Sequence, residues 1–202
     1  MRYFVTGIGT EIGKTITSAI LVEALESDYW KPIQAGELEY SDTHKVKDLI
    51  SNNKSQFHQE SYRLKAAMSP HAAAQKEGLE IQINNCIAPQ TDNTLIIEGA
   101  GGLLVPLNDT DCIIDLIAQF KAETILVSQH YLGSINHTLL SVEALQKRGL
   151  TIKGIIFIGD ENKDTEKIIL SKTGLHFLGR IPLMNKINQG TIKTIAQNFK
   201  HI

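Results

Sequence analysis

A glycine-rich stretch near the N-terminus, GIGTEIGKT (residues 7–15), ends in a lysine and a threonine. Between a strand and a helix, such a turn directs backbone N–H groups and the positive end of the helix at a phosphate. Lys14 is then expected to reach the β- and γ-phosphates, and the Thr15 hydroxyl to contact Mg²⁺. Five residues separate Gly7 from Gly13, whereas four are usual in this motif. The alternative is a tight turn that contains Gly-Lys-Thr by chance, but the order of strand, glycines, lysine, threonine and helix favours a nucleotide site.

A second acidic position lies where an apolar segment ends. Glu98 follows Thr94-Leu95-Ile96-Ile97 and precedes Gly99-Ala100-Gly101-Gly102. An acid at the end of such a strand holds Mg²⁺ in many nucleotide-binding proteins. The three glycines indicate a backbone that approaches a ligand closely or has positive φ. The alternative is an acid that caps the next element beside a flexible loop; next to a phosphate loop, the metal role is favoured.

The remaining elements must place these residues together. Short apolar runs predict strands at residues 2–6, 30–33, 94–98, 124–128, 152–158 and 176–181, and helical spacing predicts helices at 15–27, 135–146, 161–172 and 191–199. Continuous apolar runs are typical of strands buried on both faces of a parallel sheet. The sequence therefore predicts an α/β fold, doubly wound, with a mostly parallel sheet flanked by helices, of the P-loop NTPase type. Residues 37–90 are less regular and are expected to carry substrate loops.

Length and composition exclude several classes of protein. The 202 residues predict a single domain over residues 1–202, and 42% hydrophobic with 21% charged residues excludes disorder and coiled coil. A net charge of −2 gives no field for nucleic acid. No apolar run has the length of a membrane span or signal peptide, so we expect a cytoplasmic protein with no nucleic-acid or membrane partner. Cys86 and Cys112 lack metal-ligand spacing and are expected to be buried, reduced thiols.

Further short stretches accompany the two motifs along nearly the whole chain. They are KPIQAG (31–36), Ser41-Asp42, SPHAAA (69–74) with Glu77-Gly78, LLVPL (103–107) directly after EGAGG, LGSINH (132–137) and GRIP (179–182). With TEIGKT (10–15), they resemble the dethiobiotin synthetase family. EGAGG together with LGSINH carries most of the specificity, because phosphate loops occur in many families.

The resemblance implies an ATP-dependent cyclo-ligase of biotin synthesis. Family members use 7,8-diaminononanoate, CO₂ or bicarbonate, ATP and Mg²⁺. One amine becomes a carbamate, ATP phosphorylates it, and the second amine displaces phosphate to close the cyclic urea of dethiobiotin. The implied catalytic residues are Lys14, Lys31 and Thr10, and the implied metal ligands are Thr15, Asp42 and Glu98.

The resemblance also implies two sets of binding residues. The nucleotide-binding set is Gly9, Thr10, Glu11, Ile12, Gly13, Lys14, Thr15, Thr17, Glu98, Gly101, Pro182 and Leu183. The substrate-binding set is Thr10, Lys31, Ala35, Ser69, Pro70, Gly101, Gly102, Ser134 and Asn136. In the family, the helix end that corresponds to residues 132–136 holds the substrate carboxylate from the neighbouring subunit, so a homodimer with a site at the subunit interface is implied.

Several of these positions have simpler explanations. Lys31 could be a solvated lysine at a strand end, Asp42 a helix N-cap, and Asn136 a local capping group. Two positions also depart from the family. Ile158 stands where many members have an asparagine that reads adenine, which leaves the base selectivity open, and Ala35 stands where Ser or Thr is common.

Two other functions compete with ring closure. Deviant P-loop ATPases of the partitioning or septum-site type, which act as interaction proteins, have an extra lysine five residues before the motif lysine, where this chain has Gly9. Amide-forming ligases of cofactor synthesis with a related ATPase domain usually add a glutaminase domain, for which 202 residues leave no room.

Overall fold

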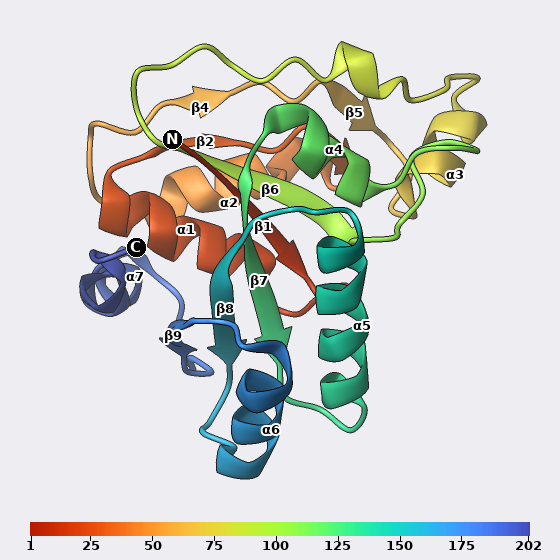
Figure 1. Ribbon diagram of the computed structural model, residues 1–202. Coiled ribbons are helices and arrows are strands. Elements are labelled where there is room, and N and C mark those ends of the chain that lie inside the picture. The colour runs from red at the N-terminus through yellow and green to blue at the C-terminus, as the bar shows by residue number, and fades with distance from the viewer.

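A seven-stranded sheet forms the centre of the computed structural model, which describes residues 1–202 (Figure 1). Across the sheet the order is β4 (Phe57–His58), β2 (Asp28–Trp30), β6 (Leu95–Gly102), β1 (Arg2–Gly7), β7 (Glu123–Gln129), β8 (Ile152–Ile158) and β9 (Phe177–Ile181). All neighbouring strands are parallel. The predicted doubly wound α/β fold is confirmed, and five of the six predicted strands lie close to their expected bounds.

Helices cover both faces of this sheet, as buried parallel strands require. On one face α1 (Lys14–Leu25), α2 (Asp42–Leu49) and α7 (Gln189–Ala196) pack against alternate strand residues such as Val5. On the other face lie α3 (Pro70–Lys76), α4 (Ile113–Phe120), α5 (Ser134–Lys147) and α6 (Lys163–Thr173). Short 3₁₀ helices occur at Leu38–Tyr40, Ile83–Asn85 and Gln197–Phe199. The four predicted helices are confirmed, the last with a 3₁₀ end.

The strand predicted over residues 30–33 is wrong, because the chain leaves the sheet there. The strand β2 ends at Trp30, and β3 (Ile33–Ala35) pairs with β5 (Tyr62–Leu64) in a separate two-stranded sheet. Pro32 has no N–H to donate to a ladder, and its carbonyl accepts from the N–H groups of Ser61 and Tyr62 instead. As a result, Lys31 lies at the carboxyl end of β2 rather than inside a strand.

The helix α4 was not predicted, although its sequence carries a signal. Its buried residues are Ile113, Ile114, Leu116, Ile117 and Phe120, which is the spacing of one helix face. The side chain of Asp115 accepts a hydrogen bond from the backbone N–H of Cys112 at the start of the helix (2.8 Å). A nearly continuous apolar run hides this periodicity, since it also fits a buried strand.

The strand order places the carboxyl ends of β2, β6 and β1 side by side. In the register, Val5 of β1 pairs with Glu98 of β6, and Ile97 of β6 pairs with Trp30 of β2. The phosphate loop follows β1, and Lys31 follows β2. Residues that lie far apart in the sequence therefore meet at one edge of the sheet.

The two cysteines differ in their burial. Both cysteines are free; Cys86 is buried, whereas Cys112 is only half-buried, so the prediction of two buried thiols holds for one of them.

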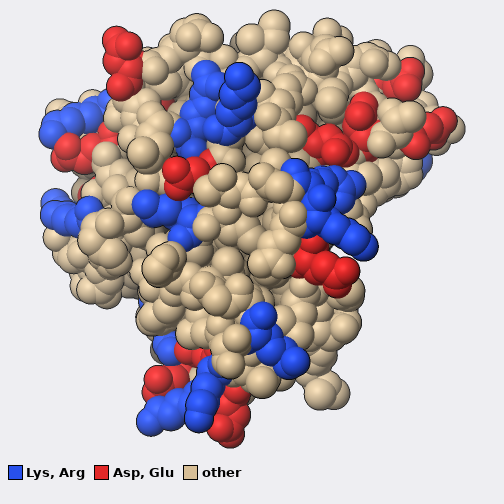
Figure 2. Space-filling model, in the orientation of Figure 1, with Lys and Arg blue, Asp and Glu red and all other residues tan.

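No helix in the structure combines the length and the apolar character needed to cross a membrane. On the face seen in Figure 2, positive and negative side chains are interspersed.

Candidate active site

The phosphate loop connects β1 to the start of α1. Gly13 precedes α1 with φ 86°, a left-handed conformation that favours glycine, and a Cβ added there would lie 3.5 Å from the side chain of Ile158. The Nζ of Lys14 donates a hydrogen bond to the carbonyl of Gly9 (2.8 Å). The lysine therefore folds back over its own loop, and the N–H groups at the start of α1 are directed at the space beside it.

The ammonium of Lys14 is buried without a direct ion pair. Burial lowers the pKa of Lys14 to about 8; the charge of Glu98 opposes this shift and the charge of Lys31 adds to it. A phosphate bound in the loop would supply the missing negative charge and raise this pKa again. The loop is thus built for an anion.

Glu98 joins three elements through its two carboxylate oxygens. It is 1% exposed and lies in β6. Its Oε1 accepts hydrogen bonds from the Thr15 hydroxyl (2.8 Å) and from the Nζ of Lys31 (3.0 Å). Its Oε2 accepts one from the hydroxyl of Tyr29 (2.9 Å). Glu98 is therefore held by three side chains within the site and does not cap the next element.

Lys31 forms an ion pair with both carboxylates of the site. Its Nζ lies 2.8 Å from Oδ2 of Asp42 and 3.0 Å from Oε1 of Glu98, and its side chain is 6% exposed. Burial alone would lower the pKa of Lys31, but the charges of Glu98 and Asp42 outweigh burial and raise it. The simpler explanation of Lys31 as a solvated lysine is therefore wrong.

Asp42 is the first residue of α2, and Ser41, not Asp42, is the N-cap. Burial acts to raise the pKa of Asp42, but Lys31 and Lys45 outweigh it and lower the pKa. The Nζ of Lys45 lies 3.1 Å from Oδ1 of Asp42 and also pairs with Glu37 (2.5 Å). The Asp42 carboxylate is thus held ionised and faces Lys31.

A cavity of about 640 Å³ opens above these residues. Thirteen of the predicted site residues line it: Thr10, Glu11, Ile12, Gly13, Lys14, Thr15, Lys31, Ala35, Asp42, Ser69, Pro70, Glu98 and Gly101. They come from the phosphate loop, the segment after β2, the starts of α2 and α3, and the end of β6. The structure therefore gathers most of both predicted sets into one cavity.

Three predicted residues support the walls of the cavity without lining it. The carbonyl of Gly9 accepts from Lys14, and Gly102 pairs with Gly7 across the sheet. The Thr17 hydroxyl is buried and donates to the carbonyl of Gly13 (2.9 Å). Their contacts with the loop are internal to the protein.

The other predicted residues lie outside the cavity lining. Pro182 and Leu183 are exposed directly after β9. Ser134 is buried and Asn136 exposed at the start of α5. The N-cap of α5 is Gly133, with no side-chain cap bond, so Asn136 does not serve as the local cap that was the alternative for it.

Several site residues were missed by the sequence reasoning. Gln34, Glu37 and Lys45 line the cavity, and Gln34 accepts from the N–H of Asp42 (3.3 Å). Tyr29 contacts Glu98 from within the core. No local signal marks Tyr29, because a buried aromatic residue in a short strand is typical of the core.

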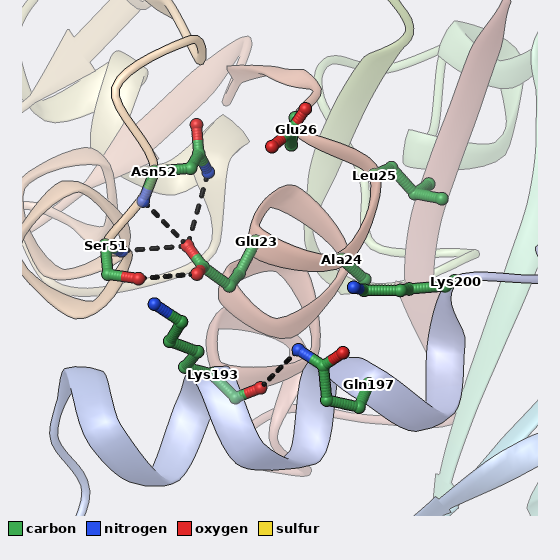
Figure 3. Close-up of a pocket in the computed structure, with 9 residues that line it drawn as sticks. All are labelled: Glu23, Ala24, Leu25, Glu26, Ser51, Asn52, Lys193, Gln197 and Lys200. Carbon is green, nitrogen blue, oxygen red and sulfur yellow. Dashed lines mark hydrogen bonds between the residues drawn. The ribbon is translucent and has the colours of Figure 1, made fainter.

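A second cavity, of about 510 Å³, lies at the far end of α1 (Figure 3). Glu23 dominates it: this carboxylate accepts hydrogen bonds from the backbone and side chains of Ser51 and Asn52. Lys193 and Lys200 also line this cavity. None of the predicted site residues lies here, and the Glu23 contacts serve to attach the loop after α2 to α1.

The sequence matches known families along nearly its whole length. A model described as "AAA domain" matches residues 1–191. The ATP-dependent dethiobiotin synthetase of Christiangramia forsetii is 54% identical over 98% of this chain and 95% of that protein, and that of Cytophaga hutchinsonii is 52% identical over 96% and 95%. The corresponding protein of Agrobacterium fabrum is 40% identical over 98% and 94%.

Solved structures share the fold at low identity. A ParA family ATPase from Chlorobium tepidum matches with a TM-score of 0.57 and 12% identity, over 99% of this chain and 92% of that chain. The septum site-determining protein MinD of Pyrococcus horikoshii, complexed with Mg-ADP, matches with a TM-score of 0.55 and 12% identity over 97% and 95%. At this identity the likeness establishes the P-loop ATPase fold alone.

Proposed function

This chain belongs to the ATP-dependent dethiobiotin synthetase family, and from that membership we propose how its own residues carry out the reaction. The enzyme uses ATP to convert 7,8-diaminononanoate and CO₂ into dethiobiotin, ADP and phosphate. Solved structures of partitioning and septum-site ATPases share only the fold with this chain and do not favour that alternative function; in addition, Gly9 stands where those ATPases have a lysine.

The ATP phosphates bind in the phosphate loop beside Lys14. The support is the direction of the helix N-terminus and the buried ammonium, which lacks an anionic partner. On ATP binding, Lys14 exchanges the carbonyl of Gly9 for phosphate oxygens. Its charge then stabilises the negative charge that develops during phosphoryl transfer.

The donor set of the cavity fits a magnesium ion. The Thr15 hydroxyl, Asp42 and Glu98 supply hard oxygen ligands, and a cation, the Lys31 ammonium, already lies between Asp42 Oδ2 and Glu98 Oε1. When bound, Mg²⁺ neutralises the charge of the phosphates. These three residues are the ones we assign to hold it.

Lys31 acts on the carbamate end of the reaction. Its ammonium lies in the cavity that also contains Thr10, Ala35, Ser69 and Pro70, and it stabilises the carbamate and the mixed anhydride by charge. The first amine adds to CO₂ and releases a proton to solvent, and an oxygen of the resulting carbamate attacks the γ-phosphorus as ADP leaves. The second amine then attacks the carbonyl carbon and expels phosphate, which takes up the proton of this amine as the ring closes.

The binding site for the substrate tail is completed by a second copy of the chain. Ser134 and Asn136 lie outside the cavity lining, and large apolar side chains are exposed around them, with Leu132 fully exposed and Ile135 and Leu140 36% and 55% exposed. A homodimer that covers this surface brings those residues to a partner's site. Sedimentation at twice the monomer mass is expected, and a fully active monomer contradicts the shared site.

Two further assignments concern the location of the protein and its division into domains. We assign a cytoplasmic location because ATP is produced and used inside cells. A single domain over residues 1–202 is supported by the one central sheet, whose strands run from Arg2 to Ile181, and by α7, which packs back on α1.

We expect the enzyme to discriminate only weakly between nucleotide bases. Ile158 lies at the end of β8, packs beside Gly13 and offers no hydrogen bond. A site that hydrogen-bonds a polar group can discriminate by several orders of magnitude, and Ile158 contributes nothing of this kind. We expect GTP and CTP to support turnover with kcat/KM within about tenfold of the ATP value.

Initial rates with the three nucleotides check this expectation. Ile158→Asn, which restores the amide common in the family, is the matched variant and should increase the preference for ATP. If GTP and CTP are inert with the wild-type enzyme, another group reads the base.

The meeting of Lys14, Lys31, Asp42 and Glu98 in one cavity carries the residue assignments. The test is the dependence of ADP release on the second and third substrates. Release should require both the diamine and bicarbonate, because the carbamate is the phosphoryl acceptor. Steady ADP release with neither present, or stimulation by DNA or lipid instead, contradicts the proposal.

A further inference from the structure

The hydroxyl of Tyr29 contacts Glu98 from outside the cavity. Tyr29 lies in β2, is fully buried and is not among the cavity-lining residues. Its oxygen lies 2.9 Å from Oε2 of Glu98, whereas Thr15 and Lys31 both donate to Oε1. The partner of Oε2 therefore lies in the core, whereas both partners of Oε1 belong to the site.

The Tyr29 ring is itself held in place. Tyr29 pairs in register with Ile96, which lies two residues before Glu98 and therefore on the same face of β6. The ring of Phe57 packs against it with 6.0 Å between centroids. In the contact with Glu98 the tyrosine hydroxyl is the donor and the carboxylate oxygen is the acceptor.

We propose that Tyr29 is a positioning residue, which fixes the plane of the Glu98 carboxylate so that the oxygen not bound to Tyr29 stays directed at Thr15, in the proposed magnesium site. The inference rests on the proposed magnesium site. The terminal torsion of a glutamate is broad, so the backbone alone does not fix the plane in which the carboxylate faces the cavity. A donor to Oε2 from the rigid core removes this freedom, as outer partners of metal ligands do elsewhere.

Loss of this donor should weaken the metal site and leave the phosphate loop unchanged. In Tyr29→Phe the ring still fills its space, but Oε2 of Glu98 loses its partner in buried surroundings. Removal of such an outer partner typically costs 10- to 100-fold in metal affinity. A purely structural Tyr29 would instead lower stability without changing the metal dependence.

Tyr3 offers a matched control within the same core cluster. It is 3% exposed and its hydroxyl donates to the carbonyl of Ile202 (3.2 Å), away from Glu98. Tyr3→Phe therefore removes the hydroxyl of another buried tyrosine without touching the site. Both variants are to be compared with the wild type as full-length proteins.

The experiment measures the binding of a fluorescent ADP analogue at increasing MgCl₂, without turnover. For Tyr29→Phe we expect the Mg²⁺ concentration at half-effect to rise about tenfold or more, with an unchanged affinity for the analogue in EDTA. Tyr3→Phe should match the wild type. Should Tyr29→Phe be too unstable in buffer, all three proteins are compared in a protecting osmolyte, which strengthens folding without contacting the site.

An unshifted Mg²⁺ midpoint in folded Tyr29→Phe, or an equal shift in Tyr3→Phe, overturns the positioning role. A wild-type protein whose nucleotide binding ignores Mg²⁺ contradicts the proposed magnesium site itself. The two failures are therefore distinguishable in the same titration.

Discussion

Lys31→Met is expected to lower kcat for ring closure by about 10²- to 10³-fold or more, with little change in the affinity for ATP. The magnitude is that of removing one charge-stabilising group from a preorganised site. Lys31 is the cation that touches both Asp42 and Glu98, and it lines the same cavity as Ser69 and Pro70. The split between kcat and ATP affinity is expected because Lys14 and the N–H groups at the start of α1, rather than Lys31, are assigned to bind the ATP phosphates.

The same substitution destabilises the unliganded protein. Without the ammonium, Glu98 loses its ion-pair partner and Asp42 keeps only Lys45, and breaking a buried pair in this way costs about 3–5 kcal/mol. Urea unfolding at neutral pH measures this cost. Lys47→Met, an exposed lysine of α2, is the control and should match the wild type in both assays. A Lys31→Met enzyme with wild-type kcat refutes the assigned role.

We expect Lys14→Met to lower kcat by a similar factor but to stabilise the unliganded protein. Burial lowers the pKa of Lys14 to about 8 from an ordinary value of 10.5. Keeping the ammonium charged inside the fold therefore costs about 3 kcal/mol at neutral pH. Methionine removes this cost but also loses the hydrogen bond to Gly9, worth about 1 kcal/mol. A net gain of about 2 kcal/mol is expected.

The pH dependence gives this prediction its sign. Between pH 8 and 10.5 the unfolded chain binds more protons at Lys14 than the folded protein does, so the wild type gains stability as pH rises through this range. The advantage of Lys14→Met is therefore complete below pH 8 and shrinks toward pH 10.5. Urea unfolding of both proteins at pH 7 and pH 10 tests it. A variant that is less stable at pH 7, or an advantage that grows with pH, contradicts the buried-charge explanation.

The two lysines therefore illustrate opposite relations between stability and function. Lys31 pairs with two carboxylates and is expected to stabilise the folded protein. The buried ammonium of Lys14 has no anionic partner and is expected to lower the stability of the folded protein until a nucleotide binds. A buried charge without a partner, such as that of Lys14, is expected where an active site is preorganised to bind a charged ligand.

The phosphate loop and Glu98 could be predicted because their signals are local. Glycines, Lys14 and Thr15 lie within one turn between a strand and a helix, and Glu98 ends a continuous apolar run. The parallel sheet was equally visible, since its strands are apolar on both faces. These features depend only on the pattern of neighbouring residues.

The remaining contacts depend on how distant segments pack. That Lys31 lies between Asp42 and Glu98 follows from the strand order β2-β6-β1 and from the break at Pro32, neither of which a single sequence specifies. Lys45 reaches Asp42 because both lie on α2, three residues apart, but only the fold directs that face into the cavity. Tyr29 reads in the sequence as an ordinary core aromatic.

The most direct test of the central claim is mass-spectrometric detection of the cyclic urea product. The purified enzyme is incubated with 7,8-diaminononanoate, ¹³C-bicarbonate, ATP and MgCl₂, with Lys31→Met as the matched inactive control. We predict a product that carries one ¹³C in its ureido carbon, forms in equal amount with ADP, and is absent when any substrate is omitted. ADP formation without the labelled cyclic urea would contradict the account.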